Sequence, residues 1–385
     1  MTTRARATAG PPSVPLTWDQ VHAVRLARLH LAERAAPGAL LEVVAAIGGL
    51  QAQVLSAAEL AAWARVRDLT RSEFREALWE QRTLVKTWAM RGTLHLLATA
   101  EYPTIVAALS TRTGYRRPIW LRFRGLTLEE MDACTAAVGQ VLTDGRPRTR
   151  DELAAAVTTL TGSAAVGEKL LSGWGELLKP ASGQGMLCFG PSAGQVVTFV
   201  SPEVWLGPWE RVDPAAALQA TFERFLRTFG PTTLDEFARW WGVQPAEVRR
   251  LWNANAAQLA PVEIEGRKAW ALPADMRALQ IEATPRTVRL LPHFDPYTLA
   301  AAPYGEPVYP AAEKARIYRT AGWVSPCVLV DGRLAGVWEM EKQRNRLAVQ
   351  VTLFGAEPQR VTGAVKSEAD LLGAFLDAPV DLTIA

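Results

Sequence analysis

The sequence has few of the features by which most enzyme classes are recognised. Cysteine occurs three times in 385 residues, far apart and without a CxxC pair. This argues against a zinc ribbon and against a disulfide-held scaffold. Histidine occurs four times, and no P-loop, GxSxG or HExxH motif is present. Hydrolysis by a catalytic triad or a metal-activated water is therefore not expected, and we predict no metal ion and no cofactor.

Long apolar runs are also missing. Even the Ala-rich segment 40–66 is interrupted by charged and amide side chains, whereas a membrane span needs roughly 18 uninterrupted apolar residues. No apolar signal segment follows the early arginines. We therefore expect a cytoplasmic protein with no membrane partner. Residues 1–16, which are polar and rich in proline, are expected to form a disordered tail.

Charge of one sign is not in large excess. Lys+Arg 42 against Asp+Glu 39 gives a net charge of +3, so any basic surface must be local. Most of the cations are arginines, which form forked contacts with phosphate and carboxylate groups; codon bias explains this composition equally well. An apolar content of 49% over this length predicts two to four folded units.

What the sequence does contain is a repeated helix-start signal, Ser or Thr followed three residues later by Glu or Gln. Two of these starts resemble each other, Arg-Thr-Arg-Asp-Glu-Leu-Ala at 148–154 and Thr-Thr-Leu-Asp-Glu-Phe-Ala at 232–238. The expected capping boxes are Thr17/Gln20, Ser56/Glu59, Thr70/Glu73, Thr127/Glu130, Thr149/Glu152 and Thr233/Glu236.

The same order of expected elements surrounds these starts three times: a longer helix, a short capped helix, another helix and two strands. This order is typical of a winged helix. The sequence therefore predicts a mainly helical α+β chain with three tandem winged helices. After residue 281, short strand-like runs predict a β-rich domain. The predicted domains are winged helices over 17–110, 111–208 and 209–280, and a C-terminal domain over 281–385.

The motif Gly-Gly-Leu-Gln-Ala-Gln at 48–53 stands between two expected helices. The glycines are suited to end one helix, which leaves Gln51 and Gln53 in extended backbone. Residues two apart in extended backbone point to the same side, so the two neutral amides would share one space. Capping of helix ends or ordinary turn hydrogen bonds remains the alternative, and spacing alone favours it.

Five segments in the same order resemble the AlkZ/YcaQ family of bacterial winged-helix DNA glycosylases. The resemblance extends over about residues 17–355. The segments are Gly-Leu-Gln-Ala-Gln at 49–53, Ala-Trp-Ala-Arg at 62–65, Thr-Trp-Ala-Met-Arg-Gly-Thr-Leu-His at 87–95, Leu-Pro-His-Phe-Asp-Pro-Tyr at 291–297 and Asp-Gly-Arg-Leu-Ala-Gly-Val-Trp at 331–338.

The resemblance implies a C-shaped molecule in which the winged helices and a C-terminal β-barrel surround a DNA-sized channel. It also implies a catalytic Gln-x-Gln motif, here Gln51 and Gln53, that excises alkylated purines and unhooks crosslinks joined through guanine N7. One branch of the family has Gln-x-Asp; two glutamines place this sequence beside the self-resistance branch. The expected location is the bacterial cytoplasm, associated with the nucleoid.

The chemistry can be derived from the residues themselves. Alkylation at N7 gives guanine a positive charge, so the base leaves as a neutral group and needs little general-acid assistance. A glutamine oxygen can orient water and stabilise the oxocarbenium-like sugar, but it cannot deprotonate water. We therefore expect activity on cationic lesions and little on uracil or 8-oxoguanine. No lysine lies near the motif in sequence, so no Schiff-base step is expected.

Several side chains are candidate contacts with phosphate or lesion. For the arginines the alternative is a solvated surface, and for His95 it is a structural hydrogen bond. His293 and Asp295 are predicted to pair and support the site, although a purely structural corner is favoured. The candidate DNA contacts are Arg65, Arg91, His95, Arg148, Arg150 and, with Arg346 at the tip of an expected hairpin, Lys342 and Arg344.

The predicted partner is double-stranded DNA carrying alkylation damage or crosslinks, bound by a monomer. The alternative function is a non-catalytic winged-helix regulator or DNA-binding scaffold. A regulator usually dimerises to match a two-fold operator, and no segment resembles a dimerising coiled coil. A repair enzyme should show little preference among undamaged sequences.

Overall fold

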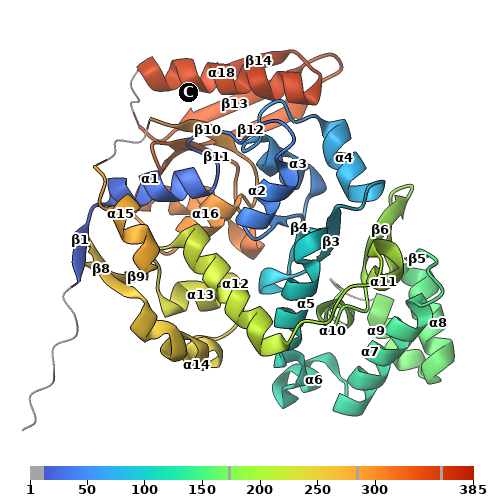
Figure 1. Cartoon of the computed structure of the whole chain (residues 1–385). Helices are drawn as coiled ribbons and strands as arrows, with labels where there is room; N and C mark the ends of the chain where they lie inside the picture. Colours follow the sequence, from blue (N-terminus) through green and yellow to red (C-terminus); the bar gives the residue numbers. More distant parts are fainter. Residues whose placement is uncertain (1–12, 172–174, 283–285, 356–358) are drawn as a thin grey trace, which may run out of the picture.

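A computed structural model describes residues 13–171, 175–282, 286–355 and 359–385. The chain is a mixed α/β protein in which helices surround four separate sheets (Figure 1). None of the helices in these ranges is long and apolar enough to cross a membrane.

The first sheet has the strand order β2-β4-β3 and lies at the centre of the molecule (Figure 1). Its short strand β2 pairs antiparallel with β4. The elements of this part are α1 (Trp18–Arg28), α2 (Leu40–Ala46), β2 (Leu50–Gln51), α3 (Leu55–Trp63), α4 (Arg71–Trp79), β3 (Leu84–Trp88), β4 (Leu94–Ala98) and α5 (Tyr102–Ser110).

The second sheet repeats this pattern in the order β5-β7-β6. The elements are α6 (Pro118–Arg124), α7 (Leu128–Leu142), β5 (Arg148–Thr149), α8 (Arg150–Thr161), α9 (Ala164–Leu171), α10 (Lys179–Gly183), β6 (Cys188–Ala193), β7 (Val196–Val200) and α11 (Pro202–Leu206).

The third sheet has the order β1-β8-β9. In this part, the segment before α13 makes only a single β-bridge, between Thr232 and Trp270 of β9. The corresponding segments of the first two parts form the short strands β2 and β5. The elements are β1 (Val14–Leu16), α12 (Pro214–Phe229), α13 (Leu234–Trp241), α14 (Pro245–Asn255), β8 (Ala260–Ile264), β9 (Arg267–Ala271) and α15 (Met276–Leu279).

Strand β1 corrects the predicted tail. Residues 14–16 pair in parallel with β8, because Leu16 is buried in the core and anchors the segment. The remainder of the predicted tail, residues 1–12, lies outside the described residues.

The C-terminal part is an open sheet in the order β10-β11-β12-β13-β14, parallel only between β13 and β14. The predicted barrel is therefore wrong for the described residues. Helix α18 packs against both edge strands, β10 and β14, so a helix covers the sheet where strands would have to meet to close it (Figure 1). The elements are β10 (Val288–Leu291), α16 (Pro296–Ala301), α17 (Lys314–Ile317), β11 (Cys327–Val330), β12 (Arg333–Lys342), β13 (Leu347–Leu353), α18 (Gln359–Leu376) and β14 (Val380–Ile384).

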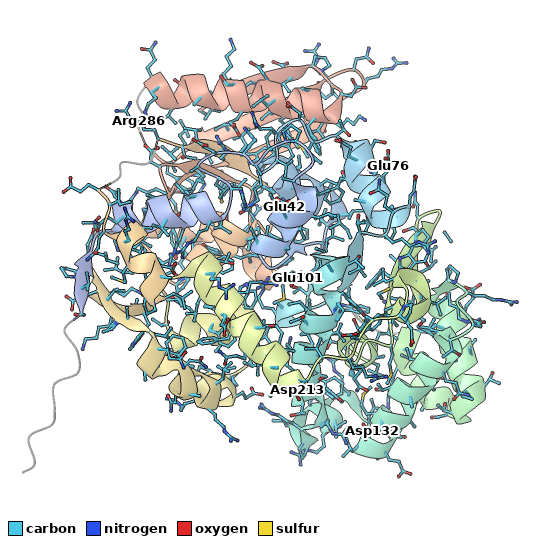
Figure 2. All side chains as sticks on the ribbon, viewed as in Figure 1. Glu42, Glu76, Glu101, Asp132, Asp213 and Arg286 are labelled. Carbon is cyan, nitrogen blue, oxygen red and sulfur yellow. The ribbon has the colours of Figure 1, made fainter. Side chains whose placement is uncertain are left out.

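Two hydrophobic cores hold the chain together. One is shared by the first, third and C-terminal parts, and the other belongs to the second part together with Trp88 of β3. Helices α5 and α12 pack together, and Glu101 at the start of α5 forms an ion pair with Arg224 within α12; Glu101 is labelled near the centre of Figure 2. The third and C-terminal parts, on either side of the predicted boundary at 281, thus share one core.

Candidate functional site

The Gln-x-Gln motif is positioned by a close contact between β2 and β4. Gly49 has a φ of +104°, and a Cβ on it would lie 2.7 Å from Leu97 Cδ2 and 3.0 Å from the Leu96 carbonyl oxygen. A side chain would therefore force the strands apart. The absence of one lets Gln51 pair directly with His95 across the sheet.

Gln51 is buried, with 7% of its surface exposed, and its side-chain oxygen is already engaged. Arg91 Nη2 donates to Gln51 Oε1 over 2.9 Å and lies 3.2 Å from His95 Nε2, while Arg91 Nη1 donates to the Trp240 carbonyl over 3.2 Å. Because the carbonyl end faces Arg91, the NH₂ end of the Gln51 amide points away from it.

The third part of the chain clamps the turn that carries Arg91. Arg91 adopts a left-handed conformation with a φ of +57°. Gly242, at the end of α13, lies so close that a Cβ would stand 2.4 Å from Arg91 Cα. Arg112 donates to the carbonyls of Ala89, over 3.2 Å, and Gly242, over 3.1 Å. The position of Arg91 thus depends on segments far apart in sequence.

The charges in this network are well defined. Burial, followed by the charge of Arg91, lowers the pKa of His95 to about 3, so His95 is neutral near pH 7. Its Nδ1 lies 3.0 Å from the Thr93 carbonyl, which assigns the proton to Nδ1 and leaves Nε2 to accept from Arg91. Burial, followed by Arg239 and Arg112, lowers the pKa of Arg91 to about 10, and Arg91 remains charged.

Buried neutral histidines make stability depend on pH. The pKa of His22 is lowered to about 4, and that of His95 to about 3, against about 6.5 in an unfolded chain. Above pH 6.5 the two histidines are neutral in both the folded and the unfolded chain. Below pH 6.5 they take up protons only in the unfolded chain, so the free energy of unfolding falls as pH falls towards 4. From pH 7.5 to 5.5 we expect a loss of about 2 to 3 kcal/mol in the free energy of unfolding. Urea denaturation at both values tests this, and equal free energies would contradict it.

Gln53 differs from Gln51 in its environment. It is exposed, and its Oε1 lies 3.5 Å from the Leu94 amide, at the limit of a hydrogen bond. The backbone between the two glutamines is held by a short bond from the Ala52 amide to the Leu94 carbonyl, at 2.7 Å. The first amide is therefore fixed and buried, whereas the second is accessible.

Two clefts flank the motif. One, of about 580 Å³, begins at Val54 and Ser56, directly after Gln53, and is also lined by His293 and the cations Arg316 and Arg319. The other, of about 450 Å³, includes Arg91 and lies where the first three parts of the chain meet; its lining includes Trp88, Arg112, Trp120, Lys179 and Gly242. The motif thus lies where ligand-sized spaces with basic linings approach the first sheet.

The prediction that Arg65 contacts DNA is wrong. Its side chain is fully buried and forms a two-pronged ion pair with Asp295, at 2.7 and 2.8 Å, and also donates to the Ala61 carbonyl. The physical reason is that α3, which precedes Arg65, is surrounded by the core and offers no solvated face at its end.

Two further predictions need correction. His95 is 2% exposed and therefore cannot reach a phosphate; it orients Arg91 instead. His293 and Asp295 do not pair. Asp295 binds Arg65 and caps α16 through the Tyr297 amide, whereas His293 Nδ1 lies 2.9 Å from the Val324 carbonyl. Asp295 therefore has the structural role that the sequence analysis favoured, and not that of a partner of His293.

The remaining candidate contacts lie on other elements. Arg148 pairs with Asp144 at 2.7 Å, and Arg150 donates to the Leu170 carbonyl, so both partly exposed side chains already have partners. Lys342 and Arg344 are exposed around the β12–β13 hairpin tip. Their contact with DNA stays a prediction.

Sequence reasoning did not identify Arg112, Trp240 or Gly242 as parts of the site. Gly242 ends α13 in the left-handed conformation, a helix stop that the glycine itself signals. Nothing in the sequence indicates that Gly242 packs on Arg91. Within the ranges that the structure describes, no three His, Cys, Asp or Glu side chains gather as a metal site would require.

Comparison with known proteins gives the class of the chain. The profile of the family described as DNA glycosylase AlkZ-like matches residues 44–375, so the chain belongs to that family and is an enzyme of the DNA glycosylase class. The interstrand DNA cross-link repair glycosylase of Streptomyces sahachiroi is 35% identical over 358 residues, 92% of this chain and 95% of the relative. The solved structure of Streptomyces sahachiroi DNA glycosylase AlkZ has a TM-score of 0.86 at 33% identity, covering 97% of this chain and all of that one. The family predicted from the five segments is confirmed.

Proposed function

We propose that this enzyme hydrolyses the N-glycosidic bond of cationic alkylated purines, above all N7-alkylguanine, and unhooks interstrand crosslinks joined through guanine N7. The observation that carries the proposal is the pair of neutral amides, one fixed by a guanidinium and one exposed, in a motif without a carboxylate or lysine. Such a pair suits a substrate whose leaving group is already activated. The printed name of the Streptomyces sahachiroi relative adds crosslink repair as the context.

The two glutamines have complementary roles in this proposal. Arg91 occupies the Gln51 oxygen, so Gln51 contributes N–H donors for a nearby sugar oxygen or phosphate. Gln53 contributes its oxygen, which accepts from the attacking water and directs its negative dipole end at the developing charge on the anomeric carbon. The water loses its proton to bulk solvent only after the C–N bond has largely broken and its oxygen has bonded to the anomeric carbon, because neither amide is a base.

The three similar sheets support a proposal about how the chain binds DNA. In each, a short segment just ahead of a helix, α3, α8 or α13, pairs with the second strand of a hairpin, as in winged helices. We propose three winged helices that bind one damaged duplex as a monomer, with the C-terminal sheet in place of a barrel. The exposed Lys342 and Arg344 then contact the backbone, and Arg148 and Arg150 reach phosphate near the α8 N-terminus.

The lesion range tests this function. We expect base release from duplexes carrying N7-methylguanine or a nitrogen-mustard crosslink, detected as alkali-labile sites, and at least roughly 100-fold slower release from uracil or 8-oxoguanine, which lack the cationic leaving group. Equal rates on uracil would contradict the proposed chemistry. A native chain that binds DNA but releases no base would support the regulator alternative.

A positioning role for Arg91 gives a second test. Arg91→Lys keeps the charge but loses the fork that joins Gln51, His95 and Trp240, so we expect a roughly 10- to 100-fold lower single-turnover rate, the effect of one charged hydrogen bond. DNA binding at the same salt should change little. Arg239→Lys, at a neighbouring cation outside the Gln51 contact, is the control. A rate loss explained only by weaker DNA binding would show that Arg91 is a DNA contact.

A further inference from the structure

Helix α6 presents an unusual outer face. Ile119 is 70% exposed and Phe123 is 80% exposed, more than the other exposed large apolar side chains of the described chain. Four residues apart, they lie on the same side of the helix, with the exposed Arg122 beside them. On the opposite side Leu121 is buried in the second core, so the orientation of the helix is fixed.

The segment that carries this face has charges of one sign, although other elements supply carboxylates to it. Residues 111–128 contain five arginines and no aspartate, glutamate or lysine. Three of the arginines attach the segment to other elements through carboxylates, at 2.6 Å for Arg116 to Asp132, 3.0 Å for Arg117 to Glu247 and 3.2 Å for Arg124 to Glu176. Asp132 is labelled at the lower edge of the molecule in Figure 2.

Phe123 is also held in an exposed position by its neighbour. The Arg124 guanidinium lies 5.2 Å from the Phe123 ring centroid and 5.6 Å from that of Trp120. An exposed aromatic ring beside one arginine, with the exposed Arg122 next to it in sequence, suits a ligand that combines negative charge with apolar surface. Nucleic acid has both, in its phosphates and in its sugars and bases.

The face continues towards the candidate site. Ile119 and Trp120 line the cleft of about 450 Å³ that also includes Arg91, and Arg91 holds Gln51. A ligand lying on α6 can therefore extend to the residue that positions the catalytic amide without leaving one continuous surface.

We propose that Ile119, Arg122 and Phe123, the outer face of α6, form a docking surface for the duplex DNA that flanks the lesion. Arg122 binds a backbone phosphate, and the two apolar side chains pack on the adjoining sugars. The choice of DNA rests on the proposed function and on charge complementarity, since the surface is apolar and cationic and the partner is a polyanion. This surface would contact DNA in addition to Lys342 and Arg344 at the tip of the β12–β13 hairpin.

Equilibrium binding to an undamaged duplex, measured by fluorescence anisotropy over a range of salt, tests the docking surface. Phe123→Gln should weaken binding roughly three- to tenfold with an unchanged salt slope, because it removes apolar contact only. Arg122→Gln should weaken binding and reduce the slope of log K against log salt by about 0.9, the value for one phosphate contact. Matched controls are Leu371→Gln on α18, whose leucine is 48% exposed, and Arg277→Gln on α15, whose arginine is exposed; neither should change binding.

Other outcomes would overturn the proposal. Native affinity in both α6 variants would show that DNA does not lie there. If light scattering shows a native dimer that Phe123→Gln converts to a monomer, the face is a self-association surface. Loss of binding to phosphatidylglycerol vesicles with unchanged DNA binding would assign it to a lipid surface. Base release from N7-methylguanine, measured separately at saturating enzyme, distinguishes failure of the proposed reaction from failure of the docking surface.

Discussion

Gln53→Ala should lower the single-turnover rate of base release from N7-methylguanine duplex by roughly 100- to 1,000-fold, equivalent to about 3 to 4 kcal/mol of transition-state stabilisation. Gln53 is the exposed amide of the motif, and its oxygen has only a marginal contact with the Leu94 amide. Its removal takes away the group that orients water and balances the developing positive charge. Stability should change little, because an exposed side chain is lost.

Comparison with other glutamine variants makes this prediction specific. Gln140→Ala, at an exposed glutamine of α7, should leave the rate unchanged. Gln51→Ala should also slow base release, and it should cost stability because the Arg91 donor then loses a partner in a buried site. If Gln53→Ala keeps the native rate while Gln51→Ala does not, the water is held by Gln51 and the proposed division of roles is wrong.

Arg65→Met should destabilise the fold by about 3 to 5 kcal/mol, the usual result of leaving one member of a buried ion pair without its partner. Both Arg65 and Asp295 are fully buried, and the pair joins the end of α3 to the segment that precedes α16. The measurement is urea denaturation followed by circular dichroism at pH 7.5. Arg75→Met is the control, since Arg75 is half exposed and its partner Glu59 retains Arg71; we expect at most about 1 kcal/mol there.

A double variant separates charge from packing. Arg65→Met with Asp295→Asn removes both charges, while Asn can still accept the Tyr297 amide bond that caps α16. Part of the lost stability should return, because no unpaired charge remains in the core. A double variant less stable than either single one would show that the ion pair is not the source of the loss.

The helix starts were predictable because their chemistry is local. The capping boxes at Thr17, Thr70, Thr127, Thr149 and Thr233 are all present. The predicted cap at Ser56 is wrong because α3 begins at Leu55 with Val54 as its N-cap, so Ser56 lies inside the helix. Glu59 is instead buried and paired with Arg71 and Arg75. A three-residue pattern contains no information about these distant partners.

Four of the five strands of the C-terminal sheet were also predictable, from short strand-like runs. That this sheet stays open was not predictable, because α18 and β14 were not recognised. Whether a sheet closes into a barrel depends on which element covers its edge strands. Similarly, the backbone placement of Gln51 followed from its glycines, but the Arg91 contact requires the third part of the chain to pack on a turn of the first. Arg65 was misread because a charged residue beside an Ala-rich helix suggests a surface, whereas this helix is buried on nearly all sides.

The most direct test of the central claim is single-turnover release of 7-methylguanine from one duplex by the native chain and by the double variant Gln51→Ala/Gln53→Ala, with folding checked by circular dichroism. We predict release by the native chain and little or none by a folded double variant that still binds the duplex. Release at the native rate by the folded double variant would show that the Gln-x-Gln motif is not the catalytic centre.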